Sequence, residues 1–162
     1  MASIVTGTAQ LASRPESPER QVAAICYRRK ADEIEFLLVN TTAGKWTFPK
    51  GGVGSGKLPR EAALQEAWEE AGVFGEIHKV SLTSYLHDRG DDPVLINAFL
   101  LHVERTEDPV ERFRNPRWFS PERAKKRLGE LRSARYRREF ERVIDLALVR
   151  LRHRAPGSRR TD

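Results

Sequence analysis

The chain has 162 residues, of which 39% are apolar, and this suits one globular domain with one core. It carries 29 basic and 23 acidic residues, and the formal net charge of +6 favours a polyanionic partner, although it also suits plain solubility. The single cysteine excludes an internal disulfide, and no run approaches the roughly 20 apolar residues that a membrane-spanning helix needs. No secretory signal is expected at the N-terminus, so we expect a cytoplasmic protein without a membrane partner.

The N-terminal part of the chain predicts a flexible arm followed by a β-hairpin. Residues 1–19 show weak periodicity and are expected to form a flexible arm before a domain that spans residues 20–153. Strands are predicted at 22–27 and 34–39, separated by a polar turn, and Cys26 is expected to be buried in the first of them. Trp46 and Phe48 follow in a short extended piece, where core packing is favoured over stacking on a ligand.

A short helix is predicted after a glycine-rich loop. Pro59 suits the first helical position, where its missing N–H costs no intrahelical bond, and Gly72 suits the residue at which a helix stops. Residues at helical spacing predict one apolar stripe, made of Leu64, Ala67, Trp68 and Ala71.

Three glutamates of this helix form a candidate metal site. Glu66 and Glu70 are four residues apart and share a face, and Glu69 flanks them. Clustered carboxylates repel one another unless solvent or a cation holds them, and Mg²⁺ binds a few carboxylates together with waters and substrate phosphates. The glycines of the preceding loop permit close approach of a ligand, and Lys50 and Lys57 add positive charge. The helix pattern alone favours an ordinary helix with a solvated acidic face, because acidic helical faces are common.

The middle of the chain predicts two strands and a polar turn. A long strand is expected at 76–87 and a buried one at 94–103. His87 and Arg89, in the turn between them, are candidates for one wall of the substrate site, although hairpin turns are usually only polar. Three acidic residues follow the second strand, and each is expected to be a surface charge rather than a further metal ligand: Glu104, Glu107 and Asp108.

The C-terminal part predicts an extended segment within 112–119 and two helices. Ser120 and Pro121 start a helix that ends near Gly129, and a longer helix with an apolar face runs over 133–151. The opposite face carries many arginines, and we interpret it as solvated rather than as binding nucleic acid, because interleaved aromatic residues are sparse. The basic tail at 154–162 is expected to be disordered.

The segment GGVGSGKLPREAALQEAWEEAGV at 51–73 resembles the Nudix box, G-x5-E-x7-R-E-U-x-E-E-x-G-U, in which U is aliphatic. Gly51 matches the leading glycine, and the helical half is matched by Glu66, Ala67, Glu69, Glu70, Gly72 and Val73. The preceding WTFPKGG is also typical of the family. Two positions depart, since Lys57 stands where the family has glutamate and Gln65 where it has arginine. A hydrogen bond between Lys57 and Gln65 is expected to replace part of the family's salt bridge.

The resemblance implies an α/β fold, namely an α/β/α sandwich with a mixed sheet, and hydrolysis of a diphosphate bond with Mg²⁺ or Mn²⁺ as cofactor. Glu66 and Glu70 are the first choices as catalytic metal ligands, and Glu69 is a third ligand or the base for the attacking water. Further residues are expected to bind the phosphates of a small-molecule substrate: Lys50, Gly51, Gly52 and Lys57. The sequence looks most like the branch that hydrolyses diphosphoinositol or diadenosine polyphosphates.

The two departures from the box leave a second hypothesis open. A catalytically weak Nudix-fold module that binds a nucleotide or polyphosphate as a sensor would tolerate Lys57 and Gln65. The presence of all three helix glutamates favours the enzyme, because a pure binding module does not need them. The oligomeric state is not readable from the sequence.

Overall fold

The computed structural model describes residues 20–89 and 92–153. The predicted flexible arm and the predicted basic tail lie outside these described residues. No helix within the described residues is long and apolar enough to cross a membrane.

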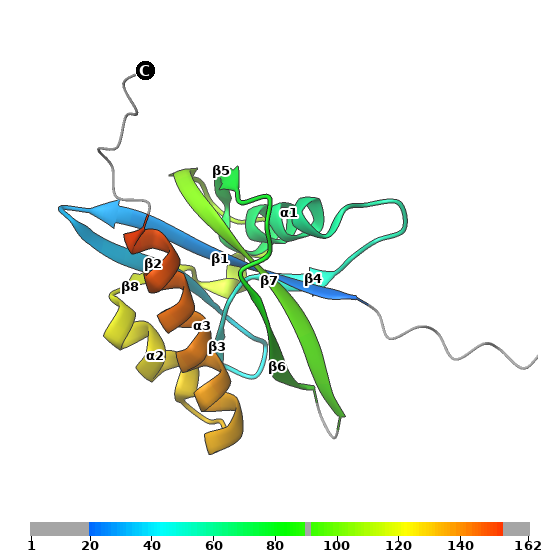
Figure 1. Cartoon of the computed structure of the whole chain (residues 1–162). Coiled ribbons are helices and arrows are strands. Elements are labelled where there is room, and N and C mark those ends of the chain that lie inside the picture. Colours follow the sequence, from blue (N-terminus) through cyan, green and yellow to red (C-terminus); the bar gives the residue numbers. More distant parts are fainter. Residues whose placement is uncertain (1–19, 90–91, 154–162) are drawn as a thin grey trace, which may run out of the picture.

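A mixed sheet of eight strands forms the middle layer (Figure 1). Its strands are β1 (Gln21–Lys30), β2 (Glu33–Asn40), β3 (Trp46–Thr47), β4 (Lys50–Gly52), β5 (Val73–Ile77), β6 (Thr83–Arg89), β7 (Asp92–Thr106) and β8 (Arg117–Phe119). The order along the sheet is β3-β2-β1-β7-β5, with β4 beside β1, β6 beside β7 and β8 beside β2. Strands β1 and β7 run parallel, and the other described pairs are antiparallel.

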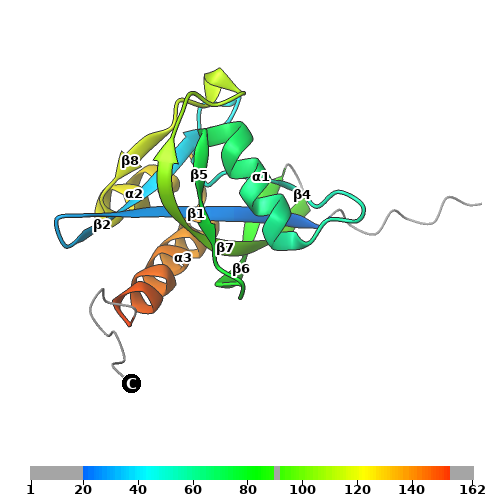
Figure 2. The ribbon, with the colours of Figure 1, turned by 90° about the horizontal axis from the view of Figure 1, so that it is seen from above.

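Helices cover both faces of this sheet, as Figures 1 and 2 show. The helices are α1 (Pro59–Ala71), the 3₁₀ turn η1 (Arg112–Arg114), α2 (Pro121–Gly129) and α3 (Ala134–Arg152). Along β1, alternate side chains enter two separate cores, because successive residues of a strand point to opposite faces. Ala24 and Cys26 pack on the side of α1, whereas Ala23 and Ile25 pack on the side of α2 and α3. The predicted α/β/α sandwich is therefore confirmed.

The predicted hairpin is confirmed as β1 and β2. Tyr27 pairs with Phe36, and the register continues to Lys30 opposite Glu33. The turn consists of Ala31 and Asp32, whose φ angles of 47° and 65° are those of a tight two-residue hairpin loop. Cys26 is fully buried, as expected.

The long strand expected at 76–87 is interrupted, and this prediction was wrong. Strands β5 and β6 both pair with the same edge of β7, but Ile77 lies opposite Leu101 while Thr83 lies opposite Ala98. The intervening residues 78–82 are too many for the space along β7, so part of the chain loops outward and leaves Val80 exposed. Apolar alternation persists through such a loop, which is why the sequence pattern did not reveal it.

The helix predicted between Pro59 and Gly72 is confirmed, but its predicted apolar stripe was partly wrong. Trp68 is 39% exposed, and Leu64 is only partly buried. The buried face consists of Ala62, Ala63, Ala67, Glu70 and Ala71. Small alanine side chains let α1 lie close to the sheet, so the helix turns its bulky residues outward and carries one glutamate inward.

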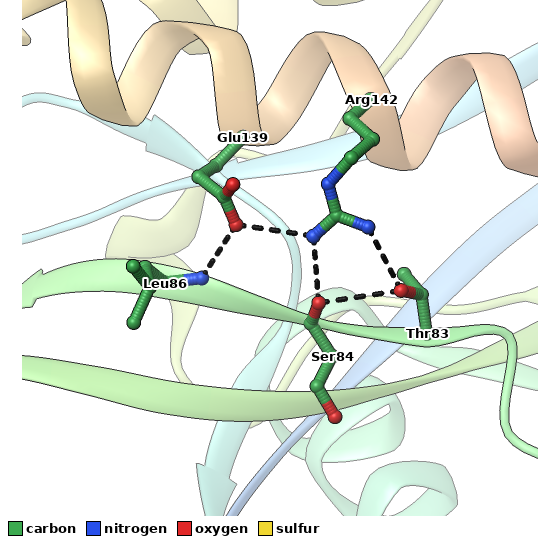
Figure 3. A network of polar contacts seen from close by, with 5 residues as sticks. All are labelled: Thr83, Ser84, Leu86, Glu139 and Arg142. Atoms are coloured by element: carbon green, nitrogen blue, oxygen red, sulfur yellow. Dashed lines mark hydrogen bonds and ion pairs between the residues drawn. The ribbon is translucent and has the colours of Figure 1, made fainter.

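The predicted C-terminal helix is confirmed as α3, which holds the outer edge of β6. Arg142 donates to the Thr83 hydroxyl at 2.9 Å and to the Ser84 carbonyl at 2.7 Å. Glu139 accepts the Leu86 amide at 2.8 Å and pairs with Arg142 at 3.1 Å (Figure 3). Within the described residues β6 pairs with β7 alone, so these side chains satisfy backbone groups that have no neighbouring strand.

An aromatic cluster joins α3 to the strands near the glycine loop. Phe48, Tyr85 and Phe140 are fully buried, with ring centroids 5.5 to 6.1 Å apart. Trp46 packs against the same core, so the core role expected for Trp46 and Phe48 is confirmed.

Candidate active site

Glu70 lies on the buried face of α1 and is 4% exposed. One carboxylate oxygen accepts the backbone N–H of Lys50 at 3.1 Å. The other oxygen lies 3.4 Å from the guanidinium of Arg114. Burial raises the pKa of Glu70 to about 7, as do Glu66 and Glu111, while Arg114 and the Lys50 amide act in the opposite direction. Glu70 is therefore fixed in position by contacts from β4 and from η1.

Glu66 is half-buried and faces the backbone of Gly51. A β-carbon built on Gly51 would fall 2.3 Å from the carboxyl carbon of Glu66, so this carboxylate occupies the space that any other side chain would fill. Burial raises the pKa of Glu66 to about 7, and the charges of Glu69 and Glu111 add to the effect. Among the described residues the Glu66 carboxylate has no hydrogen bond or ion pair, which leaves it available to a ligand.

Glu69 belongs to a hydrogen-bonded chain that replaces the usual pair of the box. Lys57 donates to the side-chain carbonyl of Gln65, as predicted, and the Gln65 amide donates to Glu69 at 2.8 Å. This chain lies on the exposed side of α1. The change of both box residues therefore preserves a loop-to-helix contact, and it also links that contact to the third glutamate.

An acidic residue that sequence reasoning missed, Glu111, lies beside the two helix carboxylates. Its charge contributes to the raised pKa of both Glu66 and Glu70, and its backbone N–H donates to the carbonyl of Glu69 at 3.0 Å. The acidic candidates named from the sequence, Glu104, Glu107 and Asp108, are all exposed. The sequence signal for Glu111 was its spacing of three residues to Arg114, which suits an ion pair. This signal was weak, because the segment has no periodic pattern that predicts its structure.

A small cavity of about 250 Å³ lies beside β4, the strand whose Gly51 and Lys50 contact Glu66 and Glu70. It is lined by Gln21, Lys50, Gly51, Gly52, His87, Arg89, Val94 and Ile96. The structure thus brings three of the four predicted phosphate-binding residues together with His87 and Arg89. The turn expected over 87–93 was wrong, because β6 continues to Arg89, which pairs with Asp92 at the start of β7. Lys57, the fourth, is exposed in the loop outside this cavity.

A larger cavity of about 590 Å³, lined by Tyr27, His78 and Arg150 among others, contains none of the candidate residues.

The titratable groups that line the smaller cavity are Lys50, His87 and Arg89. Burial lowers the pKa of Lys50, whose neighbours include Arg89 and Arg132. Burial, Lys50 and Arg132 together lower the pKa of His87 to about 3, so its ring is neutral near pH 7. Nδ1 of His87 and one terminal nitrogen of Arg132 are buried without a hydrogen-bond partner in the described part of the chain. Unpaired buried groups of this kind are stabilised when an anionic ligand binds them.

Comparison with known proteins identifies the family. A family model described as the NUDIX domain matches residues 18–140. This chain belongs to the NUDIX domain family. Diphosphoinositol polyphosphate phosphohydrolase 3-alpha of Mus musculus is 32% identical over 116 residues, covering 68% of this chain and 69% of that protein. Nudix hydrolase 4 of Arabidopsis thaliana is 34% identical over 121 residues, covering 64% and 56%.

Solved structures share the fold of this NUDIX domain. The crystal structure of a C. elegans Ap4A hydrolase binary complex superposes with a TM-score of 0.70, at 22% identity, and covers 83% of this chain and 98% of that chain. At this identity the likeness establishes the fold alone.

The NUDIX family is typically metal-dependent, and the donor set of this chain fits a hard divalent cation. Glu66 and Glu70 offer carboxylate oxygens only, and burial together with neighbouring acidic charges raises the pKa of both. The missing side chain of Gly51 leaves room for the Glu66 carboxylate beside β4. Within the described residues, no three acidic, histidine or cysteine side chains converge into a complete ligand set. A partial set suits Mg²⁺, which retains several waters and also binds substrate phosphates.

Proposed function

We propose that this NUDIX chain is a metal-dependent pyrophosphohydrolase that cleaves a diphosphate bond in a polyphosphorylated small molecule. The observation that supports the proposal is that a pair of carboxylates and a cavity with basic residues lie next to each other. The carboxylates of Glu66 and Glu70 lie on one side of Gly51, and a cavity lined by Lys50 and Arg89 lies next to it. An anionic group that binds a cation and a cationic cavity that binds phosphates are the two halves of a diphosphate-hydrolysing site.

Each side chain has a distinct part in this proposal. Glu66 and Glu70 would hold Mg²⁺ or Mn²⁺, with Glu69 as the predicted third ligand or as the base. When bound, the metal supplies positive charge that stabilises the developing phosphate charge and makes water a better nucleophile. The Lys50 amide orients Glu70, while its ammonium group and Arg89 bind phosphate oxygens. Lys57, in the glycine-rich loop, is a further predicted contact to substrate phosphate.

Diphosphoinositol polyphosphates are the favoured substrate class, ahead of dinucleoside polyphosphates. Among the described residues that line the cavity, none is Phe, Tyr or Trp, the side chains on which a nucleobase would stack. Lys50 and Arg89 instead line the cavity with positive charge, and the charge of Arg132 also acts on Lys50. The similarity to a diphosphoinositol polyphosphate phosphohydrolase agrees with this preference.

The proposed activity is tested by measuring turnover of a panel of substrates with the wild-type protein and with the variant Glu70→Gln. Inositol pyrophosphates, diadenosine polyphosphates and nucleoside triphosphates are incubated with the protein in Mg²⁺, in Mn²⁺ and in EDTA, and released phosphate and nucleotide are measured. We expect metal-dependent turnover, fastest on inositol pyrophosphates and reduced by roughly 100-fold or more in Glu70→Gln. Faster turnover of a dinucleoside polyphosphate would overturn the substrate preference, and no metal-dependent turnover of any substrate would overturn the enzyme.

A second candidate function is a polyphosphate-binding module with little catalysis. The observation that favours it is that both oxygens of Glu70 are already bonded, one to Arg114 and one to the Lys50 amide. Tight binding of one panel compound without metal-dependent turnover would favour this module over the enzyme.

A further inference from the structure

Arg114 is a cation placed directly against the candidate metal ligands. Its guanidinium lies 3.4 Å from Glu70 and 3.2 Å from Glu111, and it also donates to the backbone carbonyl of Asn40 at 3.2 Å. The Arg114 side chain is 18% exposed and that of Glu70 6%, so little solvent screens their interaction. A divalent cation at Glu70 would therefore bind beside a positive charge.

The position of Arg114 is fixed by its own segment. The Glu111 amide donates to the carbonyl of Glu69, which attaches η1 to the end of α1. Asn115 then ends the turn in the left-handed conformation, with φ of 47°. Nε of Arg114 is buried without a hydrogen-bond partner among the described residues, so the side chain is not placed to satisfy all of its own donors. Besides the Asn40 carbonyl, its polar contacts are with the carboxylates of Glu70 and Glu111.

We propose that Arg114 is an internal counter-cation that holds Glu70 and Glu111 together in the metal-free protein and competes with the divalent ion for Glu70. This inference rests on the proposed metal site. Arg114 stabilises the metal-free site by reducing repulsion among Glu66, Glu70 and Glu111, and it weakens metal binding by the same charge. It thereby sets the metal concentration at which the enzyme becomes active.

An ordinary structural ion pair makes a different prediction. If Arg114 only joined η1 to α1, its removal would lower stability equally with and without metal. If it competes with metal, its removal lowers stability mainly in EDTA, and Mg²⁺ restores most of the loss, because binding to the folded state is then tighter. The increment in Tm on adding metal therefore distinguishes the two.

The test compares Arg114→Gln with Arg112→Gln. Arg112 lies two positions earlier in η1, is exposed, and has no ion pair among the described residues. Its substitution therefore removes the same charge but breaks no ion pair with Glu70 or Glu111. Tm is measured in EDTA and across a Mg²⁺ titration, and the Mn²⁺ dissociation constant is measured by electron paramagnetic resonance. We expect Arg114→Gln to bind Mn²⁺ at least about tenfold more tightly than wild type, and Arg112→Gln to change it less than about twofold.

The outcomes separate this inference from the proposed function. If wild type and Arg114→Gln show the same rise in Tm on adding metal and the same Mn²⁺ affinity, the role of Arg114 is overturned and the proposed metal site is not. No metal effect on any variant would overturn the metal site and the role of Arg114 together. If Arg114→Gln is unstable without metal, it is purified in Mg²⁺ and its Mn²⁺ affinity is measured by displacement, which needs no metal-free protein.

Discussion

Gly51 and Glu66 lie so close that a β-carbon on the glycine would fall 2.3 Å from the carboxyl carbon of the glutamate. Gly51 belongs to β4 and Glu66 to α1, so the contact sets the distance between the strand that lines the smaller cavity and the helix that carries the carboxylates. Any larger side chain at position 51 must displace the glutamate.

Gly51→Ala should reduce metal-dependent turnover by about 100-fold, because it moves Glu66 away from its place. The matched control is Gly54→Ala in the same loop, where an added β-carbon meets only the Lys57 side chain at 3.9 Å. Turnover and Mn²⁺ affinity are measured for both variants. Similar rates for the two would show that the position of Glu66 does not matter to the reaction.

Glu70→Gln should reduce turnover by roughly 100-fold or more while leaving the circular dichroism spectrum unchanged. The glutamine oxygen can still accept the Lys50 amide, so the fold keeps its contact and the site loses a negative charge. Glu107→Gln, which changes an exposed acid outside α1, is the control. An unchanged rate in Glu70→Gln would remove Glu70 from the site.

The stability of the metal-free protein should fall as pH rises from about 5 to about 8. Glu66 and Glu70 have pKa values of about 7 in the folded protein and near 4.5 in the unfolded chain, so between these values the folded state binds more protons. Their contribution is complete below pH 4.5 and is lost as pH rises through 7. Tm in EDTA, measured across this range, checks the slope. Mg²⁺ and the Glu66→Gln substitution should each flatten it, and an equally steep slope in both would contradict the assignment.

Lys50→Met should raise KM about tenfold, because Lys50 lines the cavity that we propose to bind phosphate. Lys57→Met tests the predicted loop contact in parallel, and we expect a smaller rise, since Lys57 is bonded to Gln65 outside that cavity. Steady-state kinetics on the best substrate of the panel measures both. A larger effect at Lys57 would place the main phosphate contact in the loop instead.

Arg142→Gln should lower the free energy of unfolding by about 1–2 kcal/mol, because it removes hydrogen bonds to Thr83 and Ser84 at the edge of β6. Arg138→Gln on the exposed surface of α3 is the control and should change it little. Urea denaturation measures both. Because β6 also carries His87 and Arg89, we expect KM to rise with the loss of this network, and an unchanged KM would show that the cavity wall does not depend on it.

The sequence predicted the local elements of the site well and their long-range partners poorly. The helix from Pro59 to Gly72 and the contact between Lys57 and Gln65 followed from residues near one another in the chain. Glu111 and Arg114 did not, because their proximity to Glu66 depends on how η1 folds back onto α1, and no periodic pattern marks that segment. The exposure of Trp68 was missed for a related reason, since the close approach of an alanine-rich helix face is decided by the sheet beneath it.

The parallel pairing of β1 with β7 joins segments that are distant in the sequence, such as Val22 and Asn97. Such pairing requires a large loop to close, and the chain loses conformational entropy before any stabilising contact between the two strands forms. We therefore expect this pairing to limit the folding rate. During synthesis, α1 leaves the ribosome before β7, and Arg114 emerges later still. The acidic helix therefore exists for a time beside β1 and β4 but without β7 and without the Arg114 guanidinium that pairs with Glu70.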